Sequence, residues 1–256
     1  MNPEKLNFYS KQFHSQEIKD ADEFEKNAIT FRNEFVELKY DVIQPKFDTY
    51  FQISLAIASH YRPVVQTNGC DCLFVICDQA APAQIKRVAP QLQKCYDQLI
   101  QVGNSEVIPS LMPALEKSIE YVYDNPSSQI FHDFFMHYLE TWSREATTVA
   151  ASFSYARNFI KIAPFLGMSA SRYVRPILAV IAKRLSLTQS KTHALAFLRV
   201  VTALSEQIWP VIKTHEDDIK KIIENARLIN TDNNDIDQEI QKLEEILKNS
   251  PEPLKL

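Results

Sequence analysis

The sequence contains four cysteines that could, by residue type, bind a metal ion: Cys70, Cys72, Cys77 and Cys95. Structural zinc sites use pairs of cysteines separated by two to four residues, with a second pair later in the chain. Here one residue separates the first two cysteines, four separate the next two, and only Cys95 remains for a second pair. Free cysteine packs as a small apolar residue. We therefore expect reduced, buried thiols and no metal ion.

His132, Asp133 and His137 could form a metal site or an acid–base cluster. On a helix, residues five apart are rotated by about 140° from each other, whereas paired ligands are three or four apart. The two imidazoles therefore diverge. The residues between and beside them are aromatic or apolar: Phe131, Phe134, Phe135 and Met136. This pattern indicates a buried helix without a catalytic role.

The chain has 256 residues but only three glycines, Gly69, Gly103 and Gly167, where average usage of about 7% would give about 18. Glycines so far apart cannot form a phosphate-binding loop, and no nucleophile-elbow, kinase or zinc-protease pattern occurs. We therefore predict no enzymatic activity and no cofactor. Because hairpins and bulges need glycine, the composition favours an all-α fold.

Apolar residues recur at helical spacing along the chain. The pattern predicts helices over residues 20–38, 42–60, 63–79, 82–101, 107–123, 127–143, 145–165, 169–186, 189–208, 210–229 and 234–248. Two helices and their turns occupy about 40 residues, which is the period of HEAT and armadillo repeats. We therefore expect antiparallel helix pairs stacked as an irregular HEAT/armadillo-like solenoid. A compact irregular bundle is the alternative.

Cysteines that we expect to be reduced thiols, in a chain for which we expect no secretory signal, favour a protein of the cytoplasm and nucleus. The formal net charge of −4 does not indicate a membrane or nucleic-acid partner. The longest uncharged run, residues 49–61, is too short for a bilayer span, which needs about 18–20 residues. The first residues lack an apolar segment behind a basic one, so we expect no secretory signal.

Residues 146–205 carry charge of a single sign. They contain no Asp or Glu but eight cations: Arg157, Lys161, Arg172, Arg175, Lys183, Arg184, Lys191 and Arg199. Most charge runs are solvated faces, but ordinary surfaces mix both signs, so this run favours a docking surface for an acidic protein partner. Nucleic acid is less favoured, because the spacing of the aromatic residues places most of them toward the core. Arg172 and Arg175 are expected to share one helix face and to pair with partner carboxylates.

Trp209 precedes a proline that ends the helix at Ile208. We expect the indole to be buried at the junction between adjacent helix pairs. The alternative is an exposed anchor that binds the partner.

Residues 153–159 (FSYARNF), Gly167 and residues 171–177 (SRYVRPI) resemble the family of Tel-two-interacting protein two, in which a Tyr-Ala-Arg-Asn turn precedes a similar glycine and a basic, hydrophobic helix. Residues 194–198 and 208–211 resemble its next helix and closing Trp-Pro, and residues 68–73 and 113–115 resemble its preceding repeats. The likeness covers roughly residues 65–248 and contains no catalytic motif. We divide the chain into N-terminal helices (1–60), which match less clearly, and HEAT-like helical repeats (61–256).

The resemblance implies a non-enzymatic scaffold subunit of the Triple-T complex, with Tel-two and the first Tel-two-interacting protein as partners. With the heat-shock-protein-90 machinery, that complex helps phosphatidylinositol-3-kinase-related kinases, its indirect clients, to mature and persist. The partner-binding residues that we expect are Arg157, Asn158, Arg172, Arg175 and Trp209. The alternative is a HEAT-type adaptor of the karyopherin or phosphatase-scaffold kind, which carries a cargo or a catalytic partner.

Overall fold

The structure is a computed structural model that describes residues 1–14, 20–145, 148–229 and 234–252. This described part contains α-helices and short 3-10 helices and no strand, which confirms the predicted all-α class. None of its helices combines the length and the apolar character that a bilayer span requires. The chain divides into two compact units, Met1–Asn125 and Pro126–Leu256.

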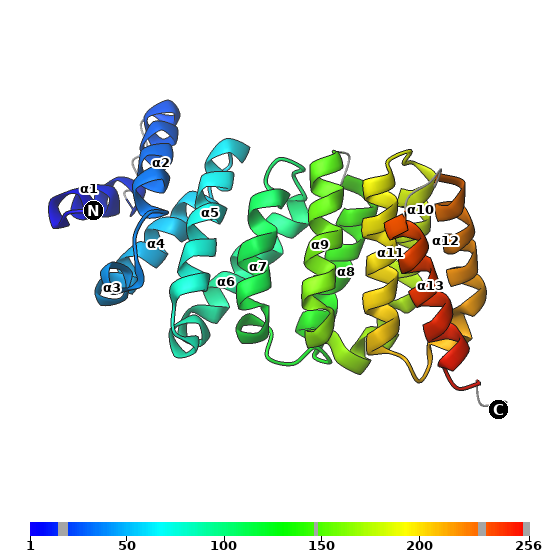
Figure 1. The fold of residues 1–256 in the computed structure, drawn as a ribbon. Coiled ribbons are helices and arrows are strands. Elements are labelled where there is room, and N and C mark those ends of the chain that lie inside the picture. The colour runs from blue at the N-terminus through cyan, green and yellow to red at the C-terminus, as the bar shows by residue number, and fades with distance from the viewer. Residues whose placement is uncertain (15–19, 146–147, 230–233, 253–256) are drawn as a thin grey trace. The chain divides into compact units, whose positions relative to one another are not determined.

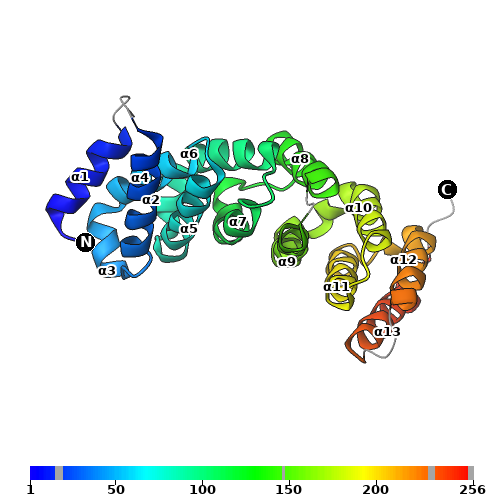
Figure 2. The ribbon, with the colours of Figure 1, turned by 90° about the horizontal axis from the view of Figure 1, so that it is seen from above.

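The first unit consists of helix pairs in two layers (Figures 1 and 2). Helices α1, α4 and α6 form one layer and α2, α5 and α7 the other, and α5 packs against α2, α4 and α7. The elements are α1 (Pro3–His14), α2 (Ala21–Phe35), α3 (Tyr40–Ile43), the 3-10 helix η1 (Gln44–Lys46), α4 (Phe47–Ala58), α5 (Pro63–Gln79), α6 (Pro82–Val102) and α7 (Ile108–Val122).

The second unit has the same organisation. Helices α8, α10 and α12 follow one another in one layer, and α9, α11 and α13 follow one another in the other. The elements are α8 (Gln129–Glu145), α9 (Val149–Leu166), η2 (Gly167–Tyr173), α10 (Val174–Ser186), α11 (Lys191–Gln207), η3 (Ile212–His215), α12 (Glu216–Ile229) and α13 (Asn234–Asn249).

The helix pairs recur at a nearly constant interval. The second helices of the pairs begin at residues 21, 63 and 108 in the first unit and at residues 149, 191 and 234 in the second. These starts are 41–45 residues apart, close to the period of HEAT and armadillo repeats. Together with the layered contacts, this interval confirms the solenoid-like arrangement of antiparallel helix pairs over the irregular bundle.

Some predicted helices differ at their starts. Helix α1 was not expected, because its apolar stripe is only three residues long: Leu6, Tyr9 and Phe13. The helix predicted over 42–60 is interrupted by η1, and those predicted over 169–186 and 210–229 begin as the 3-10 helices η2 and η3. Pro176 explains why the helix predicted over 169–186 begins as η2, since a proline in an α-helix clashes with the carbonyl four residues earlier, at Arg172.

Gly69 allows two helices of the first unit to approach closely. It lies buried within α5, where an added Cβ would come within 2.1 Å of the Ala58 nitrogen of α4. No side chain can be accommodated at that distance without moving one helix. This glycine therefore serves helix packing.

The units divide at a different place from the boundary that the sequence suggested between residues 60 and 61. Helix α4 ends before that boundary and α5 begins after it, yet the two helices pack against each other within one unit. The division at residue 60 rested on the strength of a family likeness and not on packing.

Candidate functional site

Two helix pairs of the second unit meet at their connecting turns and form a groove there. The ends of α8 and α10 lie beside the starts of α9 and α11. The side chains of Thr148 and Ser190 fix these starts, because they accept hydrogen bonds from the backbone N–H groups of Ala151 (3.1 Å) and His193 (3.5 Å). The groove has a volume of about 390 Å³ and is lined by Ser143, Arg144, Thr148, Val149, Ser152, Lys183, Arg184, Leu187, Thr188, His193 and Phe197.

The cations of α10 stabilise the C-terminus of α8. Lys183 Nζ donates to the Ser143 carbonyl (2.9 Å), and the Arg184 guanidinium donates through Nε to the Trp142 carbonyl (3.1 Å). Burial lowers the pKa of this guanidinium. The last carbonyls of a helix lack intrahelical donors and carry the negative end of its dipole. Both side chains therefore supply hydrogen bonds to the last carbonyls of α8 and also line the groove.

Three buried polar atoms at or behind the groove wall have no hydrogen-bond partner in the described part of the chain: Ser152 Oγ, His193 Nδ1 and Trp142 Nε1. His193 Nε2 lies 3.3 Å from the Val149 carbonyl, which can only accept. Nε2 therefore carries the proton, and in the neutral ring Nδ1 is an unsatisfied acceptor. Buried polar atoms are normally paired, so these atoms indicate an unfilled hydrogen-bonding capacity.

Exposed apolar side chains flank the groove. Val149, at the start of α9, and Leu187, at the end of α10, each expose 70% of their surface. The Phe153 ring is partly exposed and lies edge-on to the His193 ring, with 6.3 Å between their centroids. The groove thus combines apolar contact area, cations and unsatisfied polar atoms, which suits the binding of another molecule. Among the described residues that line it, no hydroxyl is hydrogen-bonded to the His193 ring.

None of the five residues expected to bind a partner lines this groove. Arg172 and Arg175 do not share a face of one α-helix, because the first lies in η2 and the second in α10. Arg172 Nη1 donates to the Ser127 carbonyl (3.2 Å). Arg175 lies near His215, whose pKa is lowered by burial first and by Arg175 second. Both side chains remain exposed. Arg172 precedes α10 and Arg175 lies in its first turn, whereas the groove lies at the end of that helix.

Asn158 is buried, which corrects its expected role in partner binding. Its Oδ1 accepts a hydrogen bond from the Tyr138 hydroxyl (3.2 Å), and only 2% of its surface is exposed. Residues 155–158 resemble a turn of the family of Tel-two-interacting protein two, but they lie inside α9, within the helix predicted over 145–165. Arg157 is exposed on the same helix, so of this segment it alone is available to a partner.

Trp209 is not the buried residue that the sequence predicted. It lies in the turn after α11 with 45% of its surface exposed, next to the exposed Val211. The buried tryptophan of the second unit is Trp142, whose ring stacks on Tyr155 with 5.8 Å between centroids. The alternative, in which Trp209 is an exposed anchor, agrees with its position.

The cations of residues 146–205 do not form a single patch. Lys183 and Arg184 bind carbonyls of α8, Arg172 binds the Ser127 carbonyl, and Arg199 approaches Glu239 of α13 at 3.7 Å. The sequence drew attention to residues 146–205, part of which lines the groove, but it did not predict the groove itself. The signal it lacked was the pair of apolar residues beside the turns, Val149 and Leu187.

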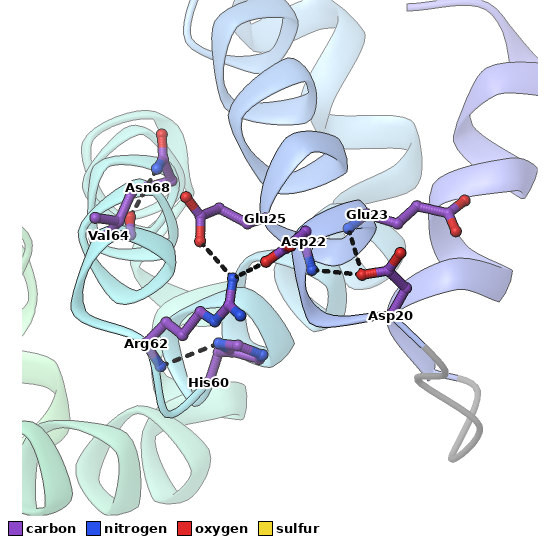
Figure 3. Close-up of polar contacts among 8 residues, drawn as sticks. All are labelled: Asp20, Asp22, Glu23, Glu25, His60, Arg62, Val64 and Asn68. Atoms are coloured by element: carbon purple, nitrogen blue, oxygen red, sulfur yellow. Dashed lines mark hydrogen bonds and ion pairs between the residues drawn. The ribbon is translucent and has the colours of Figure 1, made fainter.

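The first unit has a polar cluster at the corresponding turns (Figure 3). Arg62 Nη1 donates to Asp22 Oδ1 (2.6 Å) and to Glu25 Oε2 (3.0 Å) of α2. The backbone N–H of Arg62 donates to His60 Nδ1 (3.1 Å), and the His60 ring stacks on Phe24. These contacts are made within the chain itself, so the cluster joins two helix pairs of the first unit.

The four cysteines are free and buried, as predicted. Burial raises the pKa of Cys77 to about 11 and that of Cys95 to about 12, so both stay protonated at neutral pH. In the described ranges no three His, Cys, Asp or Glu side chains gather in a metal-binding arrangement. The absence of a bound metal stays a prediction.

No family of known proteins matches the chain, and neither does any curated protein. The fold is similar to two crystal structures of engineered proteins from the Northeast Structural Genomics Consortium. The first is 16% identical and has a TM-score of 0.67, with 97% of each chain covered. The second is 17% identical and has a TM-score of 0.63, with 97% of this chain and 99% of the other covered. At such identities the likeness concerns the fold alone.

Proposed function

We propose that the protein is a non-enzymatic helical scaffold that acts by binding other proteins. The observation that carries this proposal is the groove of the second unit, where Val149 and Leu187 are exposed beside Lys183 and unsatisfied polar atoms. Exposed apolar residues next to polar groups are typical of protein interaction sites. Stacked helix pairs serve this purpose well, because they present long, continuous surfaces.

Within this class we propose a subunit of the Triple-T complex, with Tel-two and the first Tel-two-interacting protein as its partners. What supports this identity is the resemblance of residues 153–177 and 194–211 to the family of Tel-two-interacting protein two. The clients would be phosphatidylinositol-3-kinase-related kinases, reached through the heat-shock-protein-90 machinery in the cytoplasm and nucleus.

Affinity purification of the tagged full chain from its own cells tests this proposal. We expect Tel-two and the first Tel-two-interacting protein to be recovered together, and depletion of the chain to lower the amount of the kinases. Recovery of a nuclear-transport cargo or of a phosphatase catalytic subunit in their place would contradict the Triple-T identity while keeping the scaffold class. Recovery of neither kind of protein partner would contradict both.

A further inference from the structure

We infer that the groove between α8–α9 and α10–α11 binds an extended acidic peptide segment of a partner protein, with an apolar side chain of that segment against Val149 and Leu187. This inference rests on the proposed scaffold function and names the chemistry of its partner. It assigns the contact to the turns between the paired helices and not to Arg172 and Arg175.

The unsatisfied atoms at the groove wall select a ligand that both donates and accepts hydrogen bonds. His193 Nδ1 needs a donor, and the Ser152 hydroxyl can donate and accept. The phosphodiesters of a nucleic-acid backbone present only acceptor oxygens, which do not satisfy an acceptor nitrogen. An extended peptide presents N–H and C=O groups in alternation, so it can satisfy both side chains.

The charge of the groove selects acidic residues in that peptide. Its described lining includes Arg144, Lys183 and Arg184 and no carboxylate, although Arg144 also approaches Glu140 of its own helix at 3.6 Å. The first turn of α9 adds the positive end of a helix dipole at Val149. Acidic side chains at the rim of the groove are therefore attracted, and basic ones are repelled.

The apolar rim selects at least one large apolar side chain. Val149 and Leu187 both line the groove and are largely exposed. A leucine or phenylalanine packed against them would remove apolar surface of both from water, which favours binding. Aromatic stacking of bases is less well served, because Phe153 is the partly exposed ring of this region and its edge faces His193.

Selection of a phage-displayed library of random twelve-residue peptides on the immobilised full chain tests the inference. We expect enriched peptides to combine Asp or Glu with Leu, Ile or Phe. Enrichment of basic peptides, or of none above background, would overturn the inference.

Two variants then locate the binding of one enriched peptide, labelled with fluorescein and measured by fluorescence anisotropy. Val149→Glu places a carboxylate at the start of α9, where the helix dipole favours it, so the fold is retained. Lys183→Glu reverses the charge of one groove cation. We expect each to weaken binding at least about tenfold and to do so less at high salt.

Lys161→Glu is the matched control, because it makes the same change in charge on an exposed residue of α9 outside the groove. It should leave the affinity unchanged, and circular dichroism should show all three variants folded. If Lys161→Glu weakens binding as much as Lys183→Glu, the attraction is diffuse and the inference fails. Tighter binding of a fluorescein-labelled single-stranded RNA dodecamer, lost in Lys183→Glu, would replace the peptide by nucleic acid.

The outcome separates the inference from the proposed function. If the tagged chain recovers its protein partners but Val149→Glu recovers them equally well, the scaffold function stands and the groove is not its contact. If acidic peptides bind in the groove but the Triple-T subunits are not recovered, the inference stands and the proposed complex fails.

Discussion

The junctions between successive helix pairs are built with different chemistry in the two units. In the first unit, a carboxylate of one pair meets a cation about 40 residues later. These contacts are Asp22–Arg62, Asp48–Arg87 and Asp78–Lys117, each at 2.6 Å. In the second unit, the cations of α10 meet backbone carbonyls of α8 at a similar separation, and ion pairs between helix pairs lie further along, between α11 and α13, at Arg199–Glu239 (3.7 Å) and Glu206–Lys242 (2.7 Å).

The difference follows from the acid-free segment and has a consequence for binding. Residues 146–205 supply no carboxylate, and two of their cations, Lys183 and Arg184, bind carbonyls at the end of α8. The groove beside them keeps its positive charge. The corresponding groove of the first unit, of about 310 Å³, is lined between Ala58 and Val102 by apolar and uncharged polar residues and by His60. The two units thus stack their helix pairs in the same way but present different surfaces to a partner.

The two tryptophans give the largest expected effect, and both lie in the second unit. Trp142 is fully buried, so Trp142→Ala should lower the free energy of unfolding by about 3–5 kcal/mol. Trp209→Ala should lower it by less than about 1 kcal/mol, because the side chain is half exposed. Urea unfolding followed by circular dichroism measures both. Equal losses would place Trp209 in the core after all.

Gly69→Ala should produce the next largest effect, in the first unit. The added Cβ meets backbone atoms of α4, and overpacking typically costs about 1–3 kcal/mol, of which helix propensity returns about 1 kcal/mol. Tryptophan fluorescence reports only the second unit, so the midpoint should fall more by circular dichroism than by fluorescence.

Asn68→Ala is the control for Gly69→Ala, because it changes the neighbouring position of α5 without introducing a clash. It should leave the midpoint nearly unchanged. If Gly69→Ala is equally neutral, α4 and α5 are not as close as the structure places them.

The sequence predicted the fold better than the site, for a physical reason. The helices could be predicted because apolar spacing is local, and the helix predicted over 63–79 coincides with α5. The environment of Trp209 depends on how the chain turns after α11, which spacing does not encode. Asn158 is polar yet buried because Tyr138, twenty residues earlier, supplies its hydrogen bond. The groove forms where the ends of four helices lie side by side, and no local sequence pattern predicts that arrangement.

A higher salt concentration should destabilise the first unit more than the second, by less than the substitutions above. Raising NaCl from 0.1 to 1 M shortens the Debye length from about 10 to 3 Å and weakens exposed ion pairs. Such pairs join both junctions of the first unit, whereas in the second unit the junction of α8 with α10 is made through backbone carbonyls, so the circular dichroism midpoint should fall relative to the fluorescence midpoint.

Arg62→Gln tests the origin of this salt effect, because it removes the fork to Asp22 and Glu25 and should reduce the dependence on salt. Arg184→Gln, which removes a cation-to-carbonyl contact in the second unit, should destabilise the chain to a similar extent at both salt concentrations. Equal salt sensitivity in the two units would contradict the distinction between their junctions.

The smallest effect concerns pH, where the two units should behave alike. Burial lowers the pKa of His60, with a second contribution from Arg62 that Glu25 partly opposes, and burial also lowers the pKa of His215. Each folded unit therefore binds the proton less readily than the unfolded chain, whose histidines titrate near 6.5. The free energy of unfolding should be greatest above about pH 7 and should fall as the pH drops below 6.5.

His60→Gln keeps an acceptor for the Arg62 N–H but cannot be protonated. It should therefore reduce the acid sensitivity measured by circular dichroism and leave the acid sensitivity measured by fluorescence unchanged. His215→Gln should reduce the sensitivity of the fluorescence. If His60→Gln loses as much stability between pH 7.5 and 5.5 as the unmodified chain, His60 is not the group that couples proton binding to the first unit.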